Sequence, residues 1–307
     1  MSVAVVIPTF GRPDLLRSLV PRLQAQSLKP ARILFVDDTP GNDVEEAAKE
    51  LGVSYLRNPG RPSLTRARNL GISSTTEPVI AFLDSDVQVP LDYLERMVAL
   101  LSDPRAPTAV QGHVPNAWNQ QGWKRIPLNL LLQPVNAGSR MRFRFPFRNS
   151  FPHKPRGVSE SEWLSGSNMV FHRERLCDLR FDASLERYCL GEDVDMGLQL
   201  RHHGHTILLD AETVVHELND EAGRLDNDDL ALMRVINVRH ILRKYAPRRA
   251  KGIALTYQDL GWLLQNEPTR FLSNLRRYIR HRRMVRGMRT PAEWNPLYSF
   301  WESTSNK

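Results

Sequence analysis

Two acidic motifs, far apart in the sequence, supply the residue types that metal-assisted group transfer needs. The first is the pair Asp84 and Asp86 after an apolar run, and the second is a Gly-Glu-Asp sequence that ends at Asp193 and precedes a late histidine, His216. A divalent cation held by the first motif can neutralise a leaving nucleoside diphosphate, because hard cations prefer oxygen ligands. A separate carboxylate such as Asp193 can deprotonate an attacking hydroxyl. The pattern therefore predicts metal-assisted transfer from a nucleoside diphosphate to an acceptor.

Such motifs need rigid elements to position them, and the N-terminal third of the chain alternates strand and helix patterns. Apolar β-branched runs predict buried strands, and apolar residues at helical spacing predict the helices between them. The expected strands are 3–7, 32–36, 53–56 and 78–83, and the expected helices are 15–23, 44–51, 64–72 and 91–101. Pro21 should kink or interrupt the first helix. The alternation indicates βαβ units and a mostly parallel sheet.

Polar or conformationally special residues follow each of these four strands. They are Pro8-Thr9-Phe10, Asp37-Asp38, Asn58 and Asp84-Ser85-Asp86. A single acidic strand end is usually only a turn or a helix cap. Because ligands bind at the carboxyl ends of parallel strands, four such ends on one edge indicate a binding site. No glycine-rich phosphate loop of the dinucleotide or Walker type follows any of these strands.

Five motifs in a fixed order resemble those of glycosyltransferase family two, the large inverting family with the GT-A fold. They are Val5–Arg12, Phe35–Thr39, Ala67–Gly71, Phe82–Asp86 and Gly191–Met196. The resemblance covers roughly residues 3–217 and is specific to the family, but hardly to the substrate. It implies an α/β protein with the GT-A fold, a mostly parallel Rossmann-like sheet with flanking helices, plus a C-terminal helical extension.

The resemblance also implies a division of the chain into three parts. Residues 1–113 would form the nucleotide-sugar-binding half of the GT-A domain, 114–218 the acceptor-binding half, and 219–307 a basic helical C-terminal region. Within the second part, the segment 133–155 looks irregular, proline-rich and basic, and it matches no motif of the family. Loops of that length are usually functional or disordered.

The resemblance implies a site for a uracil or thymine nucleotide at the strand ends. Phe10 would stack on the base. Asp38 would accept a hydrogen bond from the base N3–H, which cytosine does not offer. Arg68 would lie near the base or the phosphates, and Asp84 would face the ribose or the sugar. The full implied nucleotide-binding set is Pro8, Thr9, Phe10, Asp38, Asn58, Arg68, Asp84 and Ser85.

The remaining implied roles concern the metal, the base and the acceptor. Asp86 and His216 would bind Mn²⁺ or Mg²⁺. Asp193 would be the general base for attack that inverts the anomeric centre. Glu192 and Trp163 would contact the acceptor, Trp163 by stacking on a sugar face. Structural roles stay open beside these: an acid-rich helix start for Asp193, a structural histidine for His216, and a core position for Trp163.

The expected activity is the transfer of one sugar from a UDP- or dTDP-sugar to a glycan or lipid-linked saccharide in surface or exopolysaccharide assembly. The chain lacks the Gln-x-x-Arg-Trp motif of processive synthases and any apolar stretch long enough to span a bilayer. Two alternatives stay open. One is a nucleotidyltransferase that makes a nucleotide sugar, and the other is a non-catalytic basic membrane- or nucleic-acid-binding protein with a degenerate transferase domain.

The basic charge is concentrated in the C-terminal region. From Arg224 to Pro291 the chain holds 16 lysines and arginines against 5 acidic residues, whereas the whole chain carries +8. Between Phe271 and Arg289, arginines alternate with apolar residues, which suits a helix on an anionic membrane surface. A solvated basic helix packed on the catalytic domain explains the pattern equally well. Nucleic acid is not an expected partner, because no recognised binding motif accompanies the charge.

Composition is ordinary for a globular protein, with 41% apolar and 25% charged residues among 307. The only cysteines, Cys177 and Cys189, make no disulfide framework, which indicates a reducing compartment. The N-terminal sequence lacks the charged region of a signal peptide. We therefore expect a cytoplasmic protein, with peripheral attachment at the inner face of the cell membrane if the basic helices bind lipid.

Overall fold

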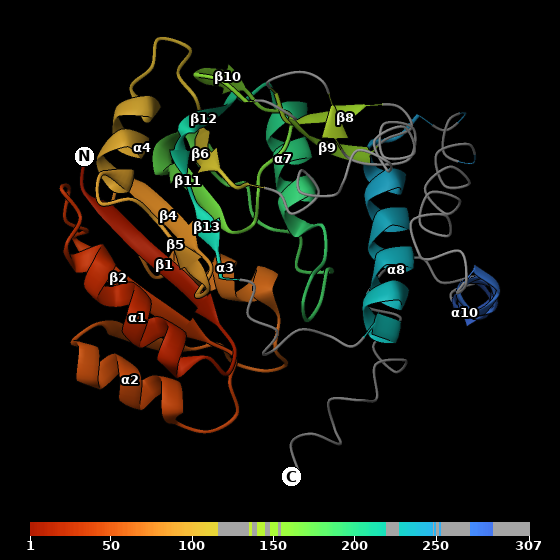
Figure 1. The fold of residues 1–307 in the computed structure, drawn as a ribbon, viewed down its shortest axis with the longest axis horizontal. Coiled ribbons are helices and arrows are strands. Elements are labelled where there is room, and N and C mark those ends of the chain that lie inside the picture. Colours follow the sequence, from red (N-terminus) through yellow and green to blue (C-terminus); the bar gives the residue numbers. More distant parts are fainter. Residues whose placement is uncertain are drawn as a thin grey trace.

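An eight-stranded mixed sheet organises the part of the chain that the structure describes (Figure 1). The structure is a computed structural model, and it describes residues 1–115, 135–136, 140–144, 148–152, 155–218, 227–247, 249, 252 and 271–284. The order across the sheet is β10-β12-β6-β11-β4-β1-β2-β3. The strands are β1 (Val3–Thr9), β2 (Arg32–Asp37), β3 (Ser54–Arg57), β4 (Val79–Leu83), β6 (Ala109–His113), β10 (Val158–Glu160), β11 (Asn168–His172) and β12 (Ile207–Val214).

Parallel pairing predominates in this sheet, as the sequence predicts. β1 pairs in parallel with β2 and β4, β2 with β3, and β6 with β12. β11 runs antiparallel to both β4 and β6, and β10 runs antiparallel to β12 at the edge. Because β11 comes from the expected acceptor-binding half and lies between two strands of the nucleotide-binding half, the two halves share one sheet.

Helices cover both faces of the sheet. One face carries α1 (Pro13–Gln24), α2 (Asp43–Leu51) and α4 (Tyr93–Leu101), and the other carries α3 (Leu64–Ser73) and α7 (Glu192–His202). In β1, Val5 and Ile7 pack in the first apolar cluster and Val6 in the second, because successive strand side chains point to opposite faces. Burial on both faces explains why these strands are continuous apolar runs in the sequence.

The first and the last of the four expected helices show the main differences from the expectation. α1 continues through Pro21 without interruption. The proline lies only three residues before the end of the helix at Gln24, and its carbonyl accepts a hydrogen bond from Ala25 N at 3.0 Å. α4 begins at Tyr93, after Pro90 and two residues later than expected.

Short strands occupy parts of the segment 133–155, so the expectation of irregular structure is wrong there. β8 (Arg142–Arg144) and β9 (Arg148–Pro152) pair antiparallel, and β7 (Val135–Asn136) pairs in parallel with β9. A separate small sheet joins β5 (Val87–Gln88) to β13 (His216–Glu217). This second pairing brings the late histidine motif next to the chain that follows the first acidic motif.

Helix α7 lies unusually close to the chain that precedes β11. A Cβ atom added at Gly197 would lie 2.5 Å from Cα of Trp163 and 3.0 Å from the backbone nitrogen of Leu164. Real Cβ atoms do not approach backbone so closely, so glycine is needed for this contact. The contact fixes the distance between α7 and the 163–168 segment. Helix α7 carries the acidic motif at 192–193, and the 163–168 segment carries Gly166, whose backbone N–H donates to Asp193.

The C-terminal extension is helical where the structure describes it. α8 (Asn227–Tyr245) lies beyond α7, and α10 (Phe271–Met284) packs against α8 on its outer side (Figure 1). A short helix, α6 (Arg173–Leu176), follows β11. None of the described helices is long and apolar enough to cross a membrane.

Candidate active site

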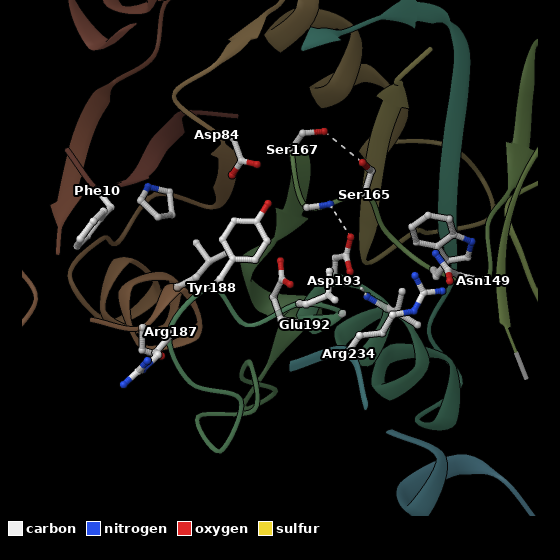
Figure 2. Close-up of a pocket in the computed structure, with 18 of the residues that line it drawn as sticks. Phe10, Asp84, Asn149, Ser165, Ser167, Arg187, Tyr188, Glu192, Asp193 and Arg234 are labelled. Carbon is white, nitrogen blue, oxygen red and sulfur yellow. Dashed lines mark hydrogen bonds between the residues drawn. The ribbon is translucent and has the colours of Figure 1, made fainter. Parts of the chain in front are cut away.

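A cavity of about 590 Å³ opens at the carboxyl ends of β1, β2 and β4. This is the sheet edge at which the sequence predicts ligand binding. The first turn of α7 and one side of α8 close the cavity from the opposite direction (Figure 2). The predicted site residues that line it are Pro8, Thr9, Phe10, Asp38, Asp84, Ser85, Asp86, Trp163, Glu192 and Asp193. The predicted site residues that do not line it are Asn58, Arg68 and His216.

The carboxylate of Asp38 is held in place by protein donors. Asn58 Nδ2 donates to Oδ1 at 2.7 Å, and the backbone N–H of Ser63 donates to Oδ2 at 3.0 Å. Burial raises the pKa of Asp38 to about 6, although both hydrogen bonds oppose that shift. Asn58 therefore acts on the site by orienting Asp38. In the same wall, the buried hydroxyl oxygen of Thr9 has no hydrogen-bond partner among the described residues, so a ligand can supply one.

Three carboxylates line the cavity where a metal is expected: Asp84, Asp86 and Glu217. Arg12 Nη1 donates to Asp86 Oδ2 at 3.0 Å, and both side chains are only 13% exposed. Within the described ranges, no three His, Cys, Asp or Glu side chains are grouped closely enough to hold a metal ion by themselves. These hard oxygen donors fit a Mn²⁺ or Mg²⁺ ion whose other ligands come from a diphosphate and water.

His216 is exposed and lies outside the cavity lining, whereas its neighbour Glu217 belongs to it. The two residues form β13, and successive residues of a strand point to opposite sides. The cavity therefore supports Glu217 more than His216 as a further ligand of the metal. Strand alternation around 214–217 was the signal that could have identified Glu217 from the sequence.

The buried guanidinium of Arg68 connects the two acidic motifs. Its Nη1 donates to Glu192 Oε1 at 2.5 Å, and its Nη2 donates to the carbonyl oxygen of Gly166 at 2.9 Å and lies 3.4 Å from Asp84 Oδ1. The Arg68 side chain is 1% exposed. The expected contact of Arg68 with a base or phosphate is therefore corrected, because carboxylates of the protein surround its charge.

Asp193 faces the cavity from the first turn of α7 (Figure 2). Its Oδ2 accepts a hydrogen bond from the backbone N–H of Gly166 at 3.0 Å, and its Oδ1 accepts one from Val194 N at 2.7 Å. Burial raises the pKa of Asp193, while these two backbone donors and Arg68 oppose the shift. A carboxylate oxygen has a second lone pair, so each can still accept a proton from a bound hydroxyl.

The two predicted acceptor residues differ in their surroundings. Glu192 is buried and bonded to Arg68, and burial together with the adjacent Asp193 raises its pKa. Trp163 is 1% exposed, donates from Nε1 to the carbonyl oxygen of Ser150 at 3.3 Å, and packs edge-to-face on Phe151. Both line the cavity, but the indole is mainly a core group, which favours the structural interpretation of Trp163.

Sequence reasoning missed the loop that faces β1 across the cavity. Arg187 and Tyr188 line the cavity, and Figure 2 shows the Tyr188 ring directed toward its centre. The backbone of Arg187 has φ +62, and its carbonyl oxygen accepts a hydrogen bond from Leu64 N at 3.0 Å. Such a conformation is costly for a residue with a side chain and is often found at binding sites. The sequence holds no motif that marks this loop.

Helix α8 also lines the cavity, on the side of Asp193. Its contributions are Arg234, Val238, Ile241 and Leu242. Arg234 and Asp193 both line the cavity and are labelled in Figure 2. The amphipathic pattern of this segment predicts a helix but not the surface against which it packs, so its part in the site was not predicted.

Comparison with known proteins gives one matching family. The model described as "Glycosyl transferase family 2" matches residues 4–164. An amylovoran biosynthesis glycosyltransferase, AmsB of Erwinia amylovora, is 25% identical over 233 residues, which are 70% of this chain and 69% of that protein. A pre-mycofactocin glycosyltransferase of Mycobacterium tuberculosis is 33% identical over 105 residues, 33% of this chain and 21% of that protein.

Solved structures show the same fold at low sequence identity. The mannosyltransferase PcManGT of Pyrobaculum calidifontis, solved with GDP-Man and Mn²⁺, gives a TM-score of 0.57 at 15% identity, covering 99% of this chain and 80% of that one. Glucosyl-3-phosphoglycerate synthase of Mycobacterium tuberculosis, solved with Mn²⁺ and UDP, gives 0.53 at 17% identity, covering 79% of each chain. Both likenesses confirm the expected GT-A architecture.

We predict that Arg68→Met destabilises the protein by about 3–5 kcal/mol, because it leaves Glu192 buried without its cation. The loss should be larger at pH 8 than at pH 5. A carboxylate whose pKa is raised by burial takes up a proton as the pH falls, and the neutral acid no longer needs the guanidinium. Urea unfolding at both pH values measures the difference.

Arg66→Met is the matched control on the same helix. Arg66 pairs with Glu186 at 2.9 Å but is 36% exposed, so its removal should cost about 0–1 kcal/mol. Equal losses for the two variants, or an Arg68→Met loss that is the same at both pH values, would contradict the assigned role of Arg68.

Proposed function

The chain belongs to glycosyl transferase family 2, and we propose that it is an inverting, non-processive transferase that moves one sugar from a UDP- or dTDP-sugar to a hydroxyl acceptor. The observation that carries the proposal is a single cavity that joins Asp38 and Asp86 on one side to the half-buried Asp193 on the other. The first two suit a nucleoside diphosphate with its metal, and the third suits the acceptor hydroxyl.

The nucleotide binds along the ends of β1 and β2. Asp38, with its orientation fixed by Asn58 and Ser63, accepts the N3–H of uracil or thymine. The ring of Phe10 stacks on the base, and the buried Thr9 hydroxyl takes a polar partner from the ligand. The orientation of Asp38 favours uracil or thymine as the bound base, because an ionised carboxylate can only accept hydrogen bonds and these bases offer the N3–H donor.

Mn²⁺ or Mg²⁺ is the proposed cofactor, held by Asp86 together with diphosphate oxygens. Asp84 and Glu217 face the same space, and His216 stays a predicted ligand that the cavity lining does not include. When bound, the cation neutralises the charge that develops on the leaving diphosphate. Arg12, which donates to Asp86 Oδ2 at 3.0 Å, lies close enough to share that neutralisation.

Asp193 is the proposed general base. It takes the proton from the acceptor hydroxyl as that oxygen bonds to C1 of the sugar, while the bond from C1 to the diphosphate breaks on the opposite face. Its raised pKa makes the carboxylate a stronger base than an exposed aspartate. Gly166 N and Val194 N hold the two oxygens, so the base is aimed before the acceptor arrives.

A glycan or lipid-linked saccharide is the proposed acceptor, in surface or exopolysaccharide assembly. The relative from Erwinia amylovora, a glycosyltransferase of amylovoran biosynthesis, supports this class. Glu192 and Trp163 stay proposed contacts at the acceptor side, and α8 adds Val238 and Leu242 to the same wall. An apolar wall beside the base suits the faces of sugar rings or the start of a lipid carrier.

The two alternative functions can be distinguished from the proposed one by their products and by their nucleotide binding. A nucleotidyltransferase would release inorganic diphosphate from a nucleoside triphosphate and a sugar phosphate. A non-catalytic binding protein would show no metal-dependent affinity for nucleotide. Thermal unfolding with UDP and Mn²⁺, alone and together, separates these cases, because a transferase of the proposed kind is stabilised synergistically by the pair.

We predict that Asp193→Asn lowers the release of UDP or dTDP from the cognate donor by about 10²–10⁴-fold, because the variant cannot accept the proton. A panel of UDP- and dTDP-sugars, with water or a glycan as acceptor, identifies the donor and supplies the assay. UDP affinity should stay near the wild-type value, since Asp193 belongs to the acceptor side. Near wild-type turnover would show that Asp193 is not the base.

We predict that Asp86→Ala abolishes the part of UDP binding that depends on Mn²⁺, and that excess EDTA silences the wild type. Calorimetric titration of UDP with and without Mn²⁺ measures the first effect. Asp14→Ala, at a carboxylate that is 94% exposed on α1, is the control and should change nothing. His216→Ala should weaken binding less than Asp86→Ala. Full activity in EDTA would leave Asp86 as a ribose or sugar contact.

We predict that α10 attaches the enzyme to anionic lipid. Leu272, Arg276, Ile279 and Arg283 recur at helical spacing and are exposed, with Leu272 at 68% and Ile279 at 41%. The opposite face, which includes Tyr278, is buried. Each arginine near an anionic surface contributes about 1 kcal/mol, and salt screens the attraction.

Co-sedimentation with neutral and anionic vesicles at low and high salt tests this attachment. Arg276→Glu with Arg283→Glu should abolish binding to anionic vesicles. The same charge change at two other exposed positions, Lys29→Glu with Arg180→Glu, should weaken it far less. Equal binding to both vesicle types, or no binding to either, would show that the exposed arginines of α10 are only solvated and do not attach the protein to lipid.

A further inference from the structure

Helix α8 supplies the cation for a buried carboxylate of the helix that carries the proposed base. Asp195 is on α7, and its side chain is fully buried. Lys244 Nζ, from the last turn of α8, donates to Asp195 Oδ1 at 2.6 Å and to Oδ2 at 2.8 Å. Residues two apart on a helix point to different sides, so the sequence alone predicts that Asp195 faces away from Asp193 as a solvated or structural charge. The structure agrees, and it shows that the charge is paired in the interior and not solvated.

Further contacts join α8 to the chain just before and within the first turn of α7. Asn237 Nδ2 donates to the carbonyl oxygen of Leu190 at 2.9 Å. A Cβ added at Gly191 would lie 3.1 Å from Ile241 Cδ1, so this side chain packs directly on the glycine. The Tyr245 hydroxyl donates to the Asp195 carbonyl oxygen at 3.3 Å. Helix α8 therefore contacts both ends of the short stretch that contains Asp193.

A second anchor of α8 does not involve α7. His240 Nε2 lies 2.7 Å from Asp182 Oδ2, in the loop before α7, and Lys244 Nζ lies 3.0 Å from the same oxygen. The exposed fractions of these side chains are 16% for His240 and 19% for Asp182. Loss of the His240 contact would weaken the attachment of α8 and would leave the ion pair between Lys244 and Asp195 in place. A variant of His240 is therefore a suitable control.

We propose that Lys244 is a positioning residue for the transfer reaction: by holding Asp195 from behind α7, it keeps the carboxylate of Asp193 aimed into the cavity. Residues two apart on a helix lie about 200° apart around its axis, so a contact on one side sets the position of the other. Of the two backbone N–H groups that donate to Asp193, that of Val194 belongs to α7, whereas that of Gly166 lies outside the helix and cannot follow it if it moves. This inference rests on the proposed role of Asp193 as the base.

The proposal gives the C-terminal extension a part in catalysis. The family match ends at residue 164, whereas Asp193 and the lysine that would position it come from later segments of the chain. The same helix lines the cavity through Val238 and Leu242. Helix α8 therefore forms part of the proposed acceptor side and also positions Asp193 relative to it. A change in α8 should alter both the cavity wall and the position of Asp193.

The test compares Lys244→Met with Lys244→Arg and with the control His240→Gln. The assay is release of nucleoside diphosphate from the wild-type enzyme's best UDP- or dTDP-sugar, with water as acceptor. Lys244→Met should lower kcat about 10- to 100-fold, the usual effect of a small misplacement, while KM for the donor changes less than about twofold. Lys244→Arg should restore most of the lost kcat, because it keeps the charge. His240→Gln should stay near wild type.

A double variant, Lys244→Met with Asp195→Asn, covers the case in which an unpaired Asp195 prevents folding. It removes both charges and should still show the lowered kcat. Wild-type kcat in Lys244→Met or in the double variant would overturn the proposal. So would equal losses in Lys244→Met and His240→Gln, because that result assigns Lys244 to the attachment of α8 alone.

Hydrogen exchange separates this inference from the proposed function. In Lys244→Met, amide exchange should speed up in residues 190–196 and 164–167, and it should stay unchanged at 36–39 beside the nucleotide side. If the wild type releases no diphosphate from any donor, the proposed function fails, but the exchange pattern still decides whether Lys244 positions this turn. Unchanged exchange at 190–196 would overturn the positioning role.

Discussion

The site depends on one buried cation. The guanidinium of Arg68 is 1% exposed and holds Glu192, Asp84 and the carbonyl oxygen of Gly166, which come from α7, the end of β4 and the segment before β11. A buried arginine is tolerable only with such partners, and buried carboxylates need it in return. These contacts join the proposed nucleotide side of the cavity to the proposed acceptor side. They also leave Asp193, the proposed base beside Glu192, to be held by backbone donors, so each of these acidic residues has a separate supporting contact.

Protein hydrogen-bond donors hold the functional carboxylates of this site in a fixed orientation. Asn58 and the N–H of Ser63 fix Asp38, and the N–H of Gly166 fixes Asp193. None of these donors needs to touch a substrate. Preorganised side chains cost little to order when the ligand binds and keep reacting atoms within the narrow geometry that transfer needs. The same logic extends outward through α7 to α8, whose contacts set where the first turn of α7 lies.

The sequence predicts the sheet, and it predicts which polar residues gather at its edge, because both depend on local patterns. Apolar runs such as 3–7 and 78–83 identify buried strands directly, and polar residues after them must meet where parallel strands end. Local patterns do not reveal contacts between residues that are far apart in the sequence. From the sequence, Arg68 is interpreted as a ligand-binding residue, whereas in the structure it contacts carboxylates 16 and 124 positions away. The sequence leaves Asp195 as a solvated or a structural charge, and only its contact with Lys244 shows that it is paired in the interior. The strands of the segment 133–155 depend on pairing that no periodicity reveals.

The central claim is that one cavity binds a nucleoside diphosphate through a metal at Asp86, with the base at Asp193 facing it. The most direct measurement is a crystal structure of the protein with UDP and Mn²⁺, in which anomalous scattering locates the manganese. The account predicts a manganese peak bonded to Asp86 and to diphosphate oxygens, with the uracil N3–H on Asp38. Manganese bound elsewhere, or UDP bound in the cavity with its diphosphate remote from Asp86, would contradict it.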